Sequence, residues 1–176
     1  MRNIRPFEDF RPQIADTAFI DESAVVTGNV VIGEDSSIWP CCSVRGDIHS
    51  IRIGERTNIQ DGSILHVTHD SDYAPGGFKL TVGDDVSVGH NVILHACTIE
   101  DLCLIGMGSV VLDGSVVQSG AMVGADSLVP PNKVLAGGFM WLGSPVKKVR
   151  ELSDKEKFFL SYLSNHYVDL KNRHSN

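Results

Sequence analysis

The chain has 176 residues, 42% of them apolar, a length that can bury one substantial hydrophobic core but hardly two, so we expect a single domain. Its net charge of -7 disfavours nucleic acid as a partner, because a phosphate backbone attracts basic surfaces and the densest basic stretch is only Lys147-Lys148-x-Arg150. Residues 1–10 lack the apolar run that secretion or membrane crossing requires, so a soluble cytoplasmic protein with no membrane partner is expected.

An aliphatic residue recurs at intervals of six over most of the chain, after a lead-in of residues 1–13. A helix repeats its inward face every 3.6 residues and a strand every two, so this interval indicates short strands joined by tight corners. Three hexads close one triangular coil of about 18 residues, and coils stack roughly 4.8 Å apart. Residues 14–142 are therefore predicted to form an all-β solenoid, a parallel β-helix. Its inward aliphatic residues are Ile14, Ile20, Val26, Ile32, Ile38, Val44, Ile53, Ile59, Leu65, Val82, Val88, Leu94, Ile105, Val111, Val117, Val123, Val129 and Leu135.

Four cysteines, Cys41, Cys42, Cys97 and Cys103, include no C-x-x-C pair. Cys42 and Cys103 fall on the inward position, four residues after many of the hexad aliphatics, where the side chain is small because a large one fits only once per hexad. Buried free thiols are favoured over a redox or metal role.

The end of the chain is predicted to be helical. Gly143-Ser144-Pro145 breaks the repeat and opens a linker of residues 143–152. Ser153-Asp154-Lys155-Glu156 has the pattern of a capping box, so a helix should begin there and run to about Lys171, within a final segment of residues 153–176. Its apolar stripe should pack on the flank of the solenoid, its own or a neighbour's. The stripe consists of Phe159, Tyr162, Leu163, His166, Tyr167 and Leu170.

Two histidines are predicted to form half of a metal site. The hexad repeat is interrupted by three extra residues after Val44 and by 11 after Leu65. His66 and His95 are 29 residues apart, and 29 minus the 11 inserted residues is 18, or one coil. Both directly follow an inward aliphatic residue, so both side chains should point outward from adjacent coils. One strand spacing is close enough for two imidazoles to share a metal ion.

A third histidine is predicted to complete the site from another subunit. His90 lies on a different edge of the triangle, so three chains around a threefold axis would bring it to the pair on a neighbour and leave one metal position open for water. Arg45 precedes His66 by 21 residues, and 21 minus three is 18; Asp61 precedes His90 by 29, and 29 minus 11 is 18. If the two columns meet, an Arg45–Asp61 ion pair should form between subunits.

The run Arg45-Gly46-Asp47, then Asn58-x-Gln60-Asp61-Gly62, then His66, His90 and His95 resembles the γ-class carbonic anhydrases and their bacterial relatives over nearly the whole chain. The resemblance implies a left-handed β-helix of hexapeptide repeats with a C-terminal α-helix on its flank, assembled as a homotrimer. It further implies that the three histidines bind zinc across the subunit interface, and that Arg45, Asp47 and Asp61 tie the subunits together.

The chemistry implied by this resemblance is reversible hydration of carbon dioxide to bicarbonate by a zinc-bound hydroxide. Gln60 would help to place the water and substrate, and Asn58 would steady the same shell. Tyr167 is a weaker candidate for contacting the site, and packing on the apolar stripe of the helix is its favoured role. Iron or cobalt in place of zinc is an alternative, since imidazole suits several metals.

The sequence departs from the best-studied members of the γ class where protons leave the site. Ile48 and His69 stand where that type has acidic residues, and the acidic loop is reduced to residues 70–78. His69 is either a substitute proton carrier or a surface histidine. Three alternatives to hydration stay open because fold and metal do not decide the substrate: an acyl-coenzyme A thioesterase, an acyltransferase-type hexapeptide protein, and a metal-binding trimer without catalysis.

Overall fold

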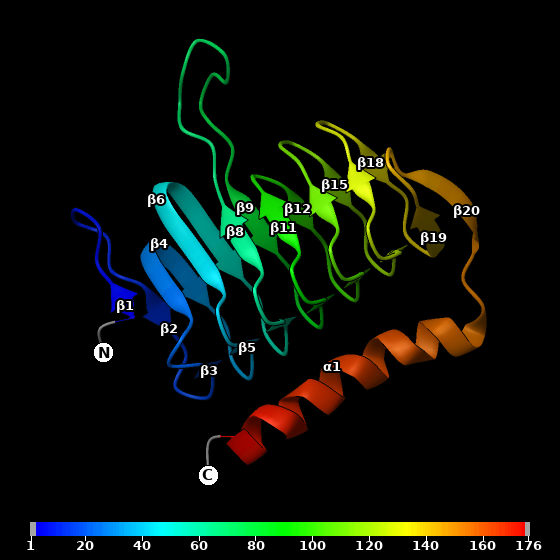
Figure 1. Cartoon of the computed structure of the whole chain (residues 1–176), viewed down its shortest axis with the longest axis horizontal. Helices are drawn as coiled ribbons and strands as arrows, with labels where there is room; N and C mark the ends of the chain where they lie inside the picture. Colours follow the sequence, from blue (N-terminus) through cyan, green and yellow to red (C-terminus); the bar gives the residue numbers. More distant parts are fainter. Residues whose placement is uncertain (1–2, 175–176) are drawn as a thin grey trace.

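The structure, a computed structural model, describes residues 3–174 as a left-handed parallel β-helix with one α-helix along its flank (Figure 1). This is the predicted fold class. Helix α1 (Asp154–His174) follows the last coil and runs back along the stack, so its C-terminal end lies beside the first coils. Among the described residues, no helix has the length and apolarity needed to span a membrane.

The coils form three faces of parallel strands, and two long strands join the first face to the second. The first face holds β8 (Ile64–His66), β11 (Ile93–His95), β14 (Val110–Val111) and β17 (Leu128–Val129). The second holds β9 (Leu80–Val82), β12 (Thr98–Ile99), β15 (Val116–Val117) and β18 (Val134–Leu135). The third holds β3 (Phe19–Ile20), β5 (Ser37–Ile38), β7 (Asn58–Ile59), β10 (Ser87–Val88), β13 (Leu104–Ile105), β16 (Met122–Val123), β19 (Phe139–Leu142) and β20 (Lys147–Glu151). The joining strands are β4 (Val25–Ile32) and β6 (Ser43–Ile53).

Both ends of the solenoid carry additional strands. At the N-terminal end, β1 (Ile4–Arg5) pairs in parallel with the first part of β4, and β2 (Gln13–Ile14) pairs with its last part. Residues 143–152 contain β20, which pairs antiparallel with β19 and so ends the parallel stacking. The segments on either side of the hexads therefore join the sheets.

The hexad aliphatics fill the inside of the triangle, as their spacing predicts. Ile38, Leu65 and Leu94 are fully buried, and Leu65 pairs in register with Leu94. The small inward positions are buried as well, and several are serines whose hydroxyl groups donate to backbone carbonyls: Ser36 Oγ to Gly54 O at 2.7 Å, for example. A buried hydroxyl costs little when it is hydrogen-bonded in this way.

The two insertions leave the stack intact but change its surface. The three extra residues are absorbed in β6, and the 11 extra residues form a loop between β8 and β9 that projects from the stack (Figure 1). Thr68 and Phe78 close the base of this loop through two backbone hydrogen bonds of 3.0 Å. The hexad after Leu94 is one residue short, a feature not expected from the sequence, since Leu94 pairs with Val111 and 111 minus 94 is 17.

Helix α1 begins with the predicted capping box and continues three residues beyond Lys171. Ser153 N donates to Glu156 Oε2 at 2.9 Å, and Glu156 N donates to Ser153 Oγ at 3.3 Å. Each side chain therefore satisfies a backbone group at the start of the helix.

The prediction of which helix face packs on the solenoid was partly wrong. The buried residues of α1 are Leu160, Ser164 and Lys171, whereas Phe159 and Tyr162 from the predicted stripe are exposed and stack on each other. The helix packs through the face that carries Leu160, Ser164 and Lys171, because the solenoid presents acidic groups to it as well as apolar ones. An apolar pattern cannot identify polar residues that dock by hydrogen bonds and ion pairs.

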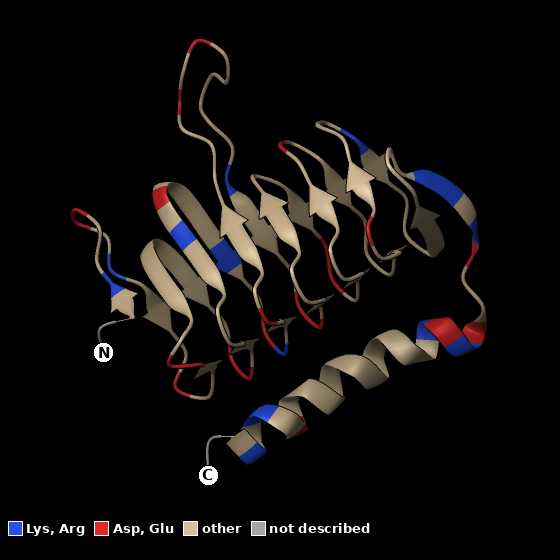
Figure 2. Cartoon of the chain, viewed as in Figure 1, with Lys and Arg blue, Asp and Glu red and all other residues tan. Residues whose placement is uncertain are grey.

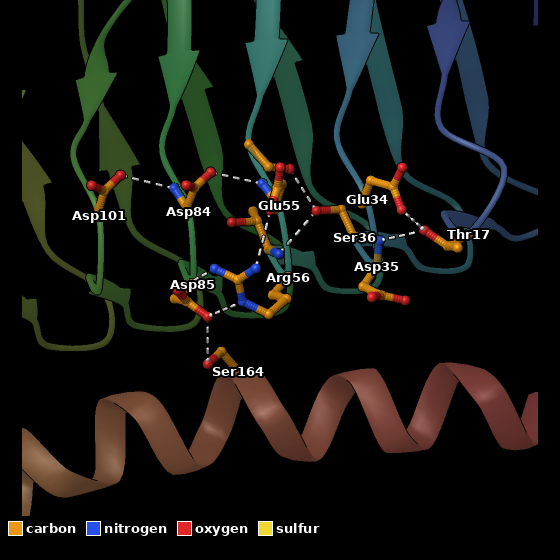
Figure 3. A network of polar contacts seen from close by, with 12 residues as sticks. Thr17, Glu34, Asp35, Ser36, Glu55, Arg56, Asp84, Asp85, Asp101 and Ser164 are labelled. Atoms are coloured by element: carbon orange, nitrogen blue, oxygen red, sulfur yellow. Dashed lines mark hydrogen bonds and ion pairs between the residues drawn. The ribbon is translucent and has the colours of Figure 1, made fainter.

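The acidic groups lie on coil corners that face α1. Figure 2 shows Asp and Glu repeated along this edge, and Figure 3 shows how they are used. Ser164 Oγ donates to Asp85 Oδ1 at 3.3 Å, and Asp85 also accepts two bonds of 2.9 Å from Arg56 (Figure 3). Lys171, only 3% exposed, pairs with Asp35 at 2.9 Å. These contacts fix the helix along the third face.

Candidate metal centre

His66 and His95 lie side by side at the corner where the first face meets the second. They end β8 and β11, and their residues pair in register, as the coil arithmetic predicts. His66 Nδ1 and His95 Nε2 face each other at 3.3 Å. Two nitrogens bound at about 2.0 to 2.1 Å to one tetrahedral ion would lie about 3.3 to 3.4 Å apart, so the observed separation fits a shared metal.

The other ring nitrogen of each histidine is held by a carboxylate. Asp47 Oδ1 accepts from His66 Nε2 at 3.1 Å, and Asp113 Oδ1 accepts from His95 Nδ1 at 2.6 Å. With those nitrogens protonated, the two facing nitrogens of the neutral rings both carry lone pairs. Facing lone pairs repel each other unless a cation lies between them. The donor set therefore fits a metal, and carboxylate partners of this kind orient metal-binding histidines in proteins.

The surroundings keep these groups in the protonation states that a metal requires. Burial lowers the pKa of His66 below its usual value, against the opposing effect of Asp47. Burial raises the pKa of Asp47, but hydrogen bonds from Arg45 and His66 outweigh it and lower the value overall. The pKa of Asp113 is likewise lowered, because hydrogen bonds from Thr68 and His95 outweigh its burial. These shifts favour a neutral His66 beside an ionised Asp47, and an ionised Asp113 beside His95.

His90 occupies the opposite edge of the first face, at the corner shared with the third. Its Nδ1 donates to Asp61 Oδ2 at 3.0 Å, so the predicted neighbourhood of these two residues is observed and Nε2 is left as the outward nitrogen. The side chain is 44% exposed. Within residues 3–174 of one chain, no three His, Cys, Asp or Glu side chains converge on one metal position. A site with three histidines would thus need a second chain.

Arg45 and Asp61 are not partners within one chain. Arg45 pairs with Asp47, and Asp61 contacts His90. The side chains of Arg45 and Asp61 are 49% and 48% exposed, so both can reach a neighbouring molecule. Their pairing between subunits stays a prediction.

Gln60 and Asn58 follow one another along the third face and are hydrogen-bonded. Gln60 Nε2 donates to Asn58 Oδ1 at 3.0 Å, and Asn58 Nδ2 donates to Ser87 Oγ at 2.8 Å. Asn58 is fully buried and Gln60 is 6% exposed. Asn58 therefore orients the Gln60 amide through its NH₂ group. The carbonyl oxygen Gln60 Oε1 remains as a hydrogen-bond acceptor for another group.

Tyr167 reaches the edge that carries His90. It lines a cavity of about 290 Å³ together with Gln60, His90, Met107 and Leu163. Burial, followed by the charge of Asp61, raises the pKa of its phenol above the usual value, so it is neutral at physiological pH. Its ring also packs edge-on against Trp39, with centroids 5.6 Å apart, as a packing residue would, and its contact with a bound metal or substrate stays a prediction.

Ile48 and His69 lie on the far side of Asp47. Both line a groove of about 630 Å³ between the corner of β6, residues 7–10 and the base of the projecting loop. Asp47 lines it too, so the groove connects the partner of His66 with solvent.

Two residues beside the histidines, Asp113 and Thr68, were not predicted from the sequence. Asp113 lies 18 residues after His95, but the coil between them has 17 residues because Leu94 pairs with Val111, so coil arithmetic points to Leu112 and not to Asp113. Thr68 carries no signal either, because it belongs to the inserted loop, where the hexad period does not apply.

The chain is similar to several known proteins. Residues 11–46 match the family model described as bacterial transferase hexapeptide (six repeats). Protein YrdA of Escherichia coli is 57% identical, over 97% of this chain and 93% of its own length. A carbonic anhydrase of Geobacillus kaustophilus is 43% identical, over 94% of this chain and 87% of its own. The crystal structure of a hexapeptide transferase family protein from Anaplasma phagocytophilum superposes with a TM-score of 0.90 at 36% identity, covering 98% of each chain.

Proposed function

The chain belongs to the hexapeptide-repeat family of the γ-class carbonic anhydrases, and from this premise we propose that it hydrates carbon dioxide reversibly at metal sites shared between the subunits of a homotrimer. The observation that carries the proposal is the pair of imidazole nitrogens from His66 and His95, 3.3 Å apart with a carboxylate behind each ring. His90 of a second chain would supply the third ligand. Zinc is the proposed metal, and iron or cobalt would also suit imidazole ligands.

An apolar column between the two half-sites supports the trimer. Ile64, Ile93, Val110 and Leu128 precede the inward residues of the first face and pair with one another in register on its outer side. Ile64 is 46% exposed and Ile93 37% exposed in the single chain. An aliphatic column on the outside of a sheet is costly in water and is typical of an interface. Because His66 and His95 lie at one edge of this face and His90 at the other, contact through it would bring complementary half-sites together.

When bound, a zinc ion would lower the pKa of a coordinated water toward about 7 and supply the nucleophile for carbon dioxide. Asp47, hydrogen-bonded to His66 Nε2, would keep the Nδ1 lone pair of His66 directed at the metal. Gln60 Oε1, held in place by Asn58, can accept a hydrogen bond from the water and so orient it. The cavity beside His90 and Gln60 is lined by Leu104 and other apolar residues, and it suits an apolar substrate such as carbon dioxide.

Hydrolysis of a small acyl thioester is the second candidate, and one observation favours it. The cavity beside His90 has about 290 Å³, far more than carbon dioxide requires, and flexible Met107 at its rim is 56% exposed. Such a cavity could hold a short acyl chain. The transferase name carried by the Anaplasma phagocytophilum relative is compatible with acyl chemistry on this fold.

Stopped-flow carbon dioxide hydration on purified protein of known metal content tests the proposal. His95→Ala should lose both metal and hydration, while His166→Ala, which removes an exposed histidine from α1, should keep both. Release of thiol from acyl-coenzyme A should be measured on the same three proteins. Full metal content without hydration would refute the proposed reaction, and thiol release that disappears in His95→Ala would establish the second candidate.

A further inference from the structure

Asp113 and Thr68 connect the base of the projecting loop to one imidazole of the candidate metal centre. Asp113 lies at the corner after β14, where Oδ1 accepts from His95 Nδ1 at 2.6 Å and Oδ2 accepts from Thr68 Oγ1 at 2.5 Å. Both carboxylate oxygens are thus engaged by side chains far apart in sequence. Thr68 is itself fixed by two backbone hydrogen bonds of 3.0 Å to Phe78.

We propose that Asp113, anchored by Thr68, is a positioning residue that fixes the tautomer and orientation of His95 for metal binding. The inference rests on the proposed metal centre and concerns only this chain's own groups. A neutral imidazole carries its proton on one of two nitrogens, and only the other nitrogen can bind a metal. A carboxylate can only accept, so Asp113 selects the Nδ1–H form of His95 and leaves the Nε2 lone pair directed at His66.

Thr68 gives this arrangement its rigidity. Alone, a corner carboxylate could rotate away from His95, since Asp113 is 30% exposed. The hydroxyl of Thr68 holds the second oxygen, and the two hydrogen bonds to Phe78 hold Thr68. The loop base is therefore a structural support of the metal ligand, and a loop whose base opens should weaken metal binding. Partners of metal-bound histidines typically contribute about 10- to 100-fold to affinity.

Asp113→Asn is the decisive variant, because it keeps the shape of the side chain but offers an NH₂ group that can donate to His95 Nδ1. That bond would stabilise the wrong tautomer, with the proton on Nε2. We expect zinc affinity, measured by competition with a chelator, to fall about 10- to 100-fold. Thr68→Val should lower affinity by a smaller factor, whereas Thr68→Ser should restore it. Asp72→Asn, which removes an exposed acid from the same loop, is the matched control and should change affinity less than about twofold.

Nitrogen-15 NMR of the metal-free protein provides a readout that does not depend on the metal. His95 should show a proton on Nδ1 in the wild type and a mixture, or a proton on Nε2, in Asp113→Asn. Unchanged tautomer and unchanged zinc affinity in that variant would overturn the inference. If the wild type bound no metal, the proposed function would fail, and the NMR signals would still decide whether Asp113 fixes His95.

Discussion

Replacing Gly28 with alanine should destabilise the protein by an amount that the backbone geometry lets us work out. Gly28 lies in β4 with φ at 81°, and a Cβ there would lie 2.9 Å from the carbonyl carbon of Gly46 and closer still to its oxygen. The left-handed conformation costs a non-glycine residue about 1 to 2 kcal/mol. Forcing the backbone of β6 away adds about 1 to 3 kcal/mol, as overpacking does elsewhere. We expect a total loss of about 2 to 5 kcal/mol.

Gly76 provides the matched control, since its φ is also 81° and a Cβ there would meet nothing within 4 Å. Gly76→Ala should therefore cost only the conformational part, about 1 to 2 kcal/mol. Urea unfolding measures both variants, at one protein concentration because the stability of the proposed trimer would depend on it. Gly28→Ala should also weaken metal binding, because Gly46 precedes Asp47, the partner of His66. Equal unfolding midpoints for the two variants would refute the close approach of β4 and β6 as the cause.

Three further predictions concern protonation, thiols and the helix cap. Burial lowers the pKa of His66, so below about pH 6.5 the unfolded chain takes up a proton at this residue that the folded chain does not. The free energy of unfolding of the metal-free protein should therefore fall as the pH falls through this range. In unfolding measured as a function of pH, His66→Gln should show a smaller fall. Burial raises the pKa of Cys42 to about 11 and that of Cys103 to about 12, and Cys97 is fully buried. A thiol reagent at pH 8 should therefore modify only the exposed Cys41 until urea is added. Labelling of a second thiol in the folded protein would contradict this prediction. Ser153→Ala should lower the free energy of unfolding by about 1 kcal/mol, because it removes the cap of α1, and should speed amide exchange in the first turn of the helix. Ser153→Thr keeps the hydroxyl group and should have neither effect. Equal amide exchange in both variants would show that the capping box is dispensable.

The solenoid was predictable from the sequence because its geometry is periodic. An inward aliphatic side chain every six residues specifies which residues stack, so the pairing of His66 with His95 and the contact between Asp61 and His90 followed from counting. The count depends on locating each insertion. The short hexad after Leu94 was overlooked, although the aliphatic spacing carries it: Ile99 follows Leu94 by five residues, so Leu94 and Ile105 are 11 residues apart rather than 12.

The helix and the inserted loop were less predictable because their contacts are not periodic. Ser164 and Lys171 face the solenoid through Asp85 and Asp35, and polar docking of this kind leaves no apolar stripe in the sequence. Thr68 contacts the candidate site from an insertion, outside the repeat. The metal, the homotrimer and the cytoplasmic location stay predictions.

Mixing two inactive variants tests most directly whether the metal centre is shared between subunits. His90→Ala keeps the pair of His66 and His95, and His95→Ala keeps His90, so each variant alone should bind no metal at full affinity. In trimers refolded from an equal mixture, about one quarter of the interfaces would join an intact pair to an intact His90. Zinc content and carbon dioxide hydration should then return to about a quarter of the wild-type values. Mixed trimers that recover neither would contradict a site divided between chains.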